Sequence, residues 1–273
     1  MLRVEPHRDV TRLVLASRAS RLVGYDVSAY LVDTPAGRVL VDTGQPAAAR
    51  DLARHLAALG GGDLRRAVRG AIVTHQHEDH AGNAATLAAA GVPLAMSAAT
   101  RAAVMRVAPP GFYRDFTWGR MRAVPPHAPA FDPDPLVLLP TPGHSPDHHA
   151  VWDAERETLF GGDLFIGVKV RIAHPGEDLR ALAQSLRRAA ALRPRRFFDA
   201  HRGLVPNAAA ALAAKAGWVE DAVARVEALL ARGWSERRVQ RAVLGREEFA
   251  GYLSRGHYSR RNFVRAVGQG RPG

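Results

Sequence analysis

Cysteine is absent from the 273-residue chain, and lysine is nearly so. Without cysteine there are neither disulfide bonds nor thiolate ligands, so any metal site must use imidazole, carboxylate and water. Lys169 and Lys215 are the two lysines among 38 basic residues, which leaves 36 arginines and a net charge of +12. This skew is compatible either with genomic base composition or with an anionic partner, such as nucleic acid or a negatively charged small molecule.

Long apolar runs are also missing. No segment approaches the roughly 20 apolar residues that span a membrane, and residues 1–9 carry charges where a secretory signal would be apolar. We therefore expect a soluble cytoplasmic protein without membrane association. The 47% of hydrophobic residues can supply the core of one large domain, with or without a small appendage.

The apolar pattern alternates with a strand-like period in the first two thirds of the chain and becomes helical toward its end. It predicts strands at 10–16, 27–33, 38–42, 68–74, 136–139, 150–153, 158–160 and 196–198. It predicts helices at 46–59, 83–90, 97–107, 177–192, 208–232, 235–244 and 259–267. The proline-rich, aromatic stretch 108–135 is predicted to be a long loop or lid. After residue 205 only helices are expected.

The most specific local feature is the segment 74–82, which reads THQHEDHAG and follows a predicted buried strand. It places three histidines and an aspartate within six positions. Buried imidazoles and carboxylates each need a partner, and a metal ion would satisfy them together. The alternative is a solvated polar loop. Three further candidate ligands, His144, Asp163 and His201, each follow a predicted strand, where rigid backbone can hold them at a cleft.

Together these residues resemble the metallo-β-lactamase fold superfamily over about residues 10 to 205, through the ordered set His-x-His-x-Asp-His, His, Asp, His. The resemblance implies an α/β fold, an αββα sandwich of two mixed β-sheets flanked by helices. We expect the catalytic domain to span 1–205 and a helical, arginine-rich C-terminal extension to span 206–273.

The resemblance also implies roles for individual residues. The expected ligands are His75, His77 and His144 for a first ion, Asp79, His80 and His201 for a second ion, and Asp163 between the two. Two Zn²⁺ are the expected cofactors, with iron or manganese as alternatives. Asp42 is expected to brace the histidine loop and His148 to orient a ligand through a hydrogen bond.

Two neighbouring cations lower the pKa of a bridging water, so that hydroxide exists near neutral pH. We therefore expect a hydrolase in which this hydroxide attacks a thioester or ester carbonyl, while Asp79 relays a proton to the leaving group. Glyoxalase II-like thioesterases share all seven ligand positions and end in helices, and they are the nearest pattern. Antibiotic-hydrolysing members lack an aspartate equivalent to Asp163, and lactone-opening members carry a tyrosine within the stretch that is 164–200 here, which has none.

The substrate stays open at this stage. Lys169, Arg171 and His174 follow Asp163 and either hold an anionic group of a small-molecule substrate or form a solvated loop. The segment 232–273 holds ten arginines and three glutamates, which keeps a small single-domain nuclease acting on RNA or another phosphodiester as an alternative. A second alternative is a mononuclear iron persulfide dioxygenase that would use His75, His77 and Asp163. The sequence predicts no oligomeric state.

Overall fold

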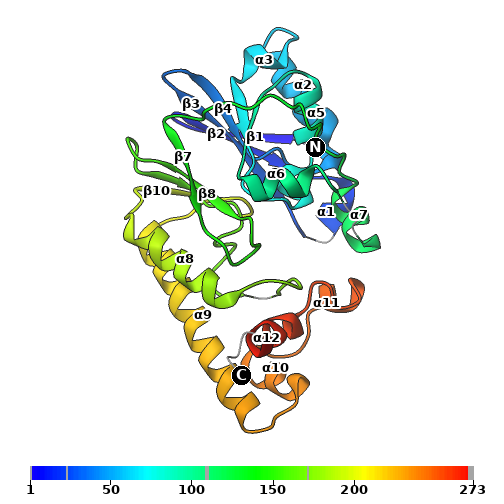
Figure 1. Cartoon of the computed structure of the whole chain (residues 1–273), viewed down its shortest axis with the longest axis vertical. Helices are drawn as coiled ribbons and strands as arrows, with labels where there is room; N and C mark the ends of the chain where they lie inside the picture. The colour runs from blue at the N-terminus through cyan, green and yellow to red at the C-terminus, as the bar shows by residue number, and fades with distance from the viewer. Residues whose placement is uncertain (1, 23, 108–110, 171, 270–273) are drawn as a thin grey trace.

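Two mixed β-sheets pack face to face, with helices on both outer sides (Figure 1). The computed structural model describes all residues except 1, 23, 108–110, 171 and 270–273. In spatial order, the first sheet contains β1 (Leu2–His7), β2 (Val10–Leu15), β3 (Val27–Thr34), β4 (Gly37–Val41), β5 (Gly70–Ile72) and β6 (Leu94–Ala95). The second sheet contains β11 (Gly203–Leu204), β10 (Arg196–Asp199), β9 (Thr158–Phe160), β8 (His149–Asp153) and β7 (Leu136–Pro140). The pairs β4–β5, β5–β6 and β9–β10 are parallel, so both sheets are mixed, as predicted.

The helices divide between the two sheets in chain order. Those of the first half are α1 (Arg18–Leu22), η1 (Pro46–Ala48), α2 (Ala49–Leu59), α3 (Leu64–Ala67), α4 (Glu78–Ala81), α5 (Ala84–Ala89), α6 (Ala98–Val104) and α7 (Phe112–Trp118). Those of the second half are α8 (Leu179–Ala191), α9 (Ala208–Ala231), α10 (Glu236–Val243), α11 (Phe249–Leu253) and α12 (Arg260–Gln269). Among the described residues, no helix is both long and apolar enough to cross a membrane.

Side chains that alternate along the strands build separate inner and outer cores, because successive residues of a strand point to opposite faces. On β3, Ala29 and Leu31 pack into the outer core, whereas Tyr30 faces the layer between the sheets. The Tyr30 ring lies 5.2 Å from that of Phe198 on β10, and its hydroxyl donates to the carbonyl of Asp199 at 2.6 Å. The inner layer therefore joins the two sheets next to the strand ends that carry the candidate ligands.

The helices after residue 205 pack onto the second sheet through α8, and α9 lies along α8 (Figure 1). Buried side chains at helical spacing on α9, such as Leu212 and Val226, share one core with Leu186 of α8 and Phe263 of α12. The helical C-terminal extension predicted from the sequence is confirmed, and it shares the core of the second sheet.

Some elements differ from the sequence prediction. Strand β1 was not predicted, because it is an edge strand with mostly exposed or half-exposed residues and lacks a clear apolar face. Helix α7 lies inside the stretch 108–135 predicted as a loop; its seven residues are too few for a periodic signal, and Gly119 ends it at φ +86°. The predicted strand 68–74 is shorter, since β5 covers Gly70–Ile72 before the chain turns into the histidine loop.

Candidate metal centre

The predicted ligands converge at one edge of the sandwich. They lie on the loops that follow β5, β7, β9 and β10 and on the short helix α4. Two groups of side chains each present ligand atoms within 4.8 Å of one another: His75, His77, His144 and Asp163 form the first group, and Asp79, His80, Asp163 and His201 form the second. Every residue predicted as a ligand is thus in one of the two groups, and Asp163 is in both.

In the first group, three imidazole nitrogens meet. Nδ1 of His77 lies 3.0 Å from Nε2 of His75 and 3.0 Å from Nε2 of His144. Nε2 of His144 lies 3.2 Å from Oδ2 of Asp163. Three imidazole nitrogens and a carboxylate oxygen within such short distances form a compact donor set of the kind that a divalent metal ion binds.

In the second group, Oδ1 of Asp163 lies 3.1 Å from Nε2 of His80 and 3.1 Å from Nε2 of His201. Asp79 is held less closely, with Oδ2 at 3.7 Å from His80 and 3.6 Å from His201. Both Nε2 of His80 and Oδ1 of Asp163 are buried and lack a hydrogen bond despite their short separation. Buried polar atoms without a partner are costly, and a divalent cation fits this donor set of imidazole and carboxylate.

Asp42 and Thr74 brace both groups from behind. The Asp42 carboxylate contacts Nδ1 of His80 at 2.8 Å and accepts from the Thr74 hydroxyl at 2.9 Å and from the Thr74 backbone N–H at 2.9 Å. The Thr74 hydroxyl in turn lies 3.0 Å from Nδ1 of His75. When each Nδ1 is the donor, Nε2 of His75 and His80 is left as the free lone pair for a metal ion. Asp42 thus lies behind both groups and contacts the loop that it is expected to brace.

His148 and His201 are each oriented by an oxygen atom that contacts the Nδ1 of the ring. Nδ1 of His148 lies 2.8 Å from the hydroxyl of Thr141, while its Nε2 accepts from the backbone N–H of Asp163 at 3.1 Å. His148 therefore positions the shared aspartate through its backbone. Nδ1 of His201 lies 2.8 Å from the carbonyl of Asp26, which aims Nε2 at the second group.

Two buried carboxylates that sequence reasoning missed hold the neighbouring loops. Glu177, at the entry to α8, lies 3.4 Å from Nδ1 of His144. Asp147 accepts from the backbone N–H of Gln76 at 2.8 Å and from the hydroxyl of Ser145 at 2.7 Å, so it joins the histidine loop to the loop of His144. The sequence offered one indication of a role for Asp147, namely its position between His144 and His148.

The charges within the site raise the pKa of the ligand histidines beside Asp163 and leave that of His75 lowered. Burial alone lowers the pKa of a histidine, but the carboxylate of Asp163 outweighs burial and raises the pKa of His144 and of His201 to about 9. Burial, with neighbouring histidines, keeps the pKa of His75 well below its ordinary value. Protons are thus drawn to the nitrogens nearest Asp163. These nitrogens are among the atoms that would bind a metal cation.

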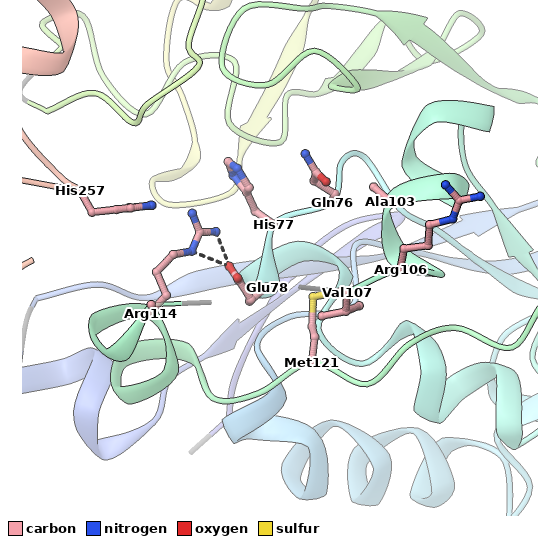
Figure 2. A pocket seen from close by; sticks show the side chains of 10 residues that line it. Gln76, His77, Glu78, Ala103, Arg106, Val107, Arg114, Met121 and His257 are labelled. Atoms are coloured by element: carbon pink, nitrogen blue, oxygen red, sulfur yellow. Dashed lines mark hydrogen bonds and ion pairs between the residues drawn. The ribbon is translucent and has the colours of Figure 1, made fainter. Parts of the chain in front are cut away.

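A cavity of about 390 Å³ opens beside His77 and is shown in Figure 2. Its lining includes Glu78 and Arg114, whose side chains are paired: Nε of Arg114 donates to Oε2 of Glu78 at 2.9 Å. Arg114 comes from α7, within the stretch predicted as a loop or lid, and His257 reaches the cavity from the C-terminal segment. Sequence reasoning assigned no role to either residue.

The three residues predicted to hold an anionic substrate group differ in their placement. His174 lies at the first group, with its ring centroid 5.5 Å from that of His77 and 5.5 Å from that of His144. Lys169 is exposed on the loop after β9, and Arg171 lies outside the described residues. Arg202, which separates His201 from Gly203, donates through Nε to the carbonyl of Ile166 and crosses the Asp163 loop.

The C-terminal segment also reaches the site. The Tyr258 ring centroid lies 4.3 Å from that of His174, and Nε1 of Trp118 donates to the Tyr258 hydroxyl at 3.3 Å. Although residues 164–200 contain no tyrosine, a tyrosine ring from a distant part of the chain thus packs against His174, beside the first group. No local sequence signal marks this contact.

The chain belongs to the metallo-beta-lactamase superfamily, whose family model matches residues 22–201. A solved metallo-beta-lactamase family protein from Thermus thermophilus has a TM-score of 0.64 at 22% sequence identity, covering 96% of this chain and 92% of that chain. At this identity the likeness shows the fold alone. Members of this superfamily are generally hydrolases, and the two His/Asp groups described above could hold divalent metal ions.

Curated relatives match about two thirds of the chain. A beta-lactamase-like protein 2 homolog of Caenorhabditis elegans is 25% identical over 198 residues, which cover 68% of this chain and 62% of that protein. The lactamase-like protein aptB of Emericella nidulans is 28% identical over 198 residues, covering 71% of this chain and 57% of that protein. The chain therefore spans less than two thirds of the length of these relatives.

Proposed function

We propose that the protein is a dinuclear metal-dependent hydrolase that cleaves a thioester or ester bond of an anionic small molecule. The observation that carries this proposal is the position of Asp163, whose two carboxylate oxygens face different groups. Oδ2 lies 3.2 Å from His144, whereas Oδ1 lies 3.1 Å from both His80 and His201. A carboxylate shared between two sets of ligands fits a site that holds two neighbouring metal ions.

Each set would hold one ion. His75, His77, His144 and Asp163 would hold the first, and Asp79, His80, His201 and Asp163 the second. When bound, such ions lower the pKa of a bound water and polarise a substrate carbonyl. Zn²⁺ suits this donor set, and iron or manganese also accepts it.

The protein's own residues would then keep the ligands in place and move a proton. Asp42 and Thr74 fix the histidine rings, and His148 fixes Asp163. Asp79 is the carboxylate with the longest contacts, at 3.6 and 3.7 Å, and its side chain is 8% exposed. We assign proton transfer toward the leaving group to Asp79, because its long contacts leave an oxygen of this carboxylate available to a substrate bound at the second group.

The test is hydrolysis by the zinc-loaded full chain of a panel of thioesters, esters, lactones, phosphodiesters and persulfides. The proposal expects the highest kcat/KM on a thioester or ester, loss of turnover with a chelator, and recovery with zinc. The double variant His75→Ala with His77→Ala should lose turnover, whereas His127→Ala, at an exposed turn, should keep it. Strongest turnover of phosphodiesters by the zinc-loaded chain would support a nuclease instead. Oxygen consumption with persulfides by a parallel sample loaded with iron, at one iron per chain, would support a dioxygenase.

A further inference from the structure

Two arginines line the cavity beside His77, and they differ in exposure and in whether a carboxylate pairs with them. Arg114 is 9% exposed, and its guanidinium is bound to the Glu78 carboxylate. Arg106, just after α6, is exposed, and within the described residues its side chain has no carboxylate partner. Figure 2 shows the Arg114–Glu78 pair on the same side of the cavity as His257, with Arg106 on the opposite side and Gln76 between Arg106 and His77.

The charges of the lining leave one positive charge uncompensated. Glu78 neutralises one of the two arginines, so Arg106 and Arg114 together with Glu78 sum to +1. Burial, helped by Arg114, lowers the pKa of His257, so this residue adds a hydrogen-bonding group rather than a charge at neutral pH. A guanidinium binds a carboxylate through two parallel hydrogen bonds, which gives both affinity and orientation.

We propose that Arg106 binds a carboxylate group of the substrate, with the paired Arg114 and the Gln76 side chain completing the binding site. This inference rests on the proposed hydrolysis at the adjacent metal centre and names the substrate class as a carboxylate-bearing small molecule. The single uncompensated charge matches a singly charged anion, while Glu78 would repel the second charge of a phosphate dianion. A cavity of about 390 Å³ lies at the small end of ligand sites, which suits a small acid.

The kinetic test uses two esters that differ in one group. One is the p-nitrophenyl monoester of glutaric acid, whose far end is a free carboxylate. The other is the p-nitrophenyl ester of glutaramic acid, with a neutral amide there. For zinc-loaded wild-type chain, kcat/KM should be higher for the carboxylate ester. In Arg106→Gln the ratio of the two kcat/KM values should fall about tenfold, as expected for one charge-assisted contact. Arg50→Gln, an exposed arginine of α2 outside the cavity, should keep the wild-type ratio.

Binding measured without turnover separates this inference from the proposed function. Ligand-observed NMR would follow glutaramate, neutral glutaramide and propyl phosphate on the wild type, Arg106→Gln and Arg50→Gln. Weaker glutaramate binding in Arg106→Gln alone supports the inference, even when no ester is hydrolysed and the proposed function fails. Equal glutaramate binding by the three proteins overturns it. Tighter binding of propyl phosphate than glutaramate, lost in Arg106→Gln, overturns the assignment of a carboxylate.

Discussion

Oδ2 of Asp42 lies 2.8 Å from Nδ1 of His80, and this buried contact determines which nitrogen of His80 faces the second ligand group. The same carboxylate reaches His75 through the Thr74 hydroxyl. One side chain at the end of β4 therefore orients a histidine in each of the two groups. Its backbone adopts φ +60°, a conformation that aspartate and asparagine tolerate better than most residues.

We predict that Asp42→Asn lowers the affinity for zinc by about 10- to 100-fold, because the variant keeps the shape and the backbone preference but removes the charge that fixes the ring of His80. Competition with a chromophoric chelator would measure the affinity. Asp33→Asn, at an exposed carboxylate on β3, is the matched control and should bind zinc like the wild type. Unchanged affinity in Asp42→Asn would show that the brace is dispensable.

Lys215 of α9 holds the loop that carries Asp163. It is buried, and its ammonium group donates to the carbonyl of Leu164 at 3.0 Å and to that of Phe165. Burial lowers its pKa to about 8, which leaves it largely protonated at pH 7. Ile166, which follows Phe165 in this loop, is a β-branched residue with φ +52°. This backbone conformation is strained, so the surrounding contacts must maintain it.

We predict that Lys215→Met reduces the free energy of unfolding by about 2 kcal/mol, because two buried carbonyls lose their donor, and weakens zinc binding through Asp163 several-fold. Urea unfolding and zinc titration at pH 7 would measure the two effects. Lys169→Met changes the only other lysine, which is exposed, and should leave both quantities near wild type. If the two variants behave alike, Lys215 does not position the loop.

Asp9 joins the turn between β1 and β2 to β10 of the other sheet, since Arg196 donates to its two oxygens at 2.7 and 2.9 Å. The hydrogen bond from Arg196 lowers the pKa of Asp9 below its ordinary value of 3.8, against the opposing effect of burial. A carboxyl group with a lowered pKa stabilises the folded state above its unfolded-state pKa, and this contribution is lost as the pH falls through the folded-state value.

We therefore predict that Asp9→Asn costs about 1 kcal/mol of unfolding free energy at pH 7, and that the difference from the wild type shrinks below pH 3.8. Denaturant unfolding at pH 7 and pH 3 with matched metal content would check this. Asp221→Asn, in a more exposed pair on α9, should change stability little at either pH. A difference that persists unchanged at pH 3 would contradict the assignment.

Local patterns carried most of the correct predictions. Most strands and outer helices follow from apolar alternation and helical spacing, whereas their arrangement in two mixed sheets was implied by the family resemblance. Residues such as Arg114 and Tyr258 could not be found in this way. The Arg114–Glu78 bond spans 36 positions and the Trp118–Tyr258 bond spans 140, so each depends on how separate elements pack. Sequence periodicity and local motifs do not predict contacts between residues so far apart in the chain.

The stoichiometry of metal binding tests the two-metal account most directly. Metal-free full chain titrated with zinc, with bound metal counted by elemental analysis, should bind two ions. His201→Ala should bind one, because it removes a residue of the second group only. One zinc ion per wild-type chain, with the same value in His201→Ala, would contradict a dinuclear centre built around Asp163.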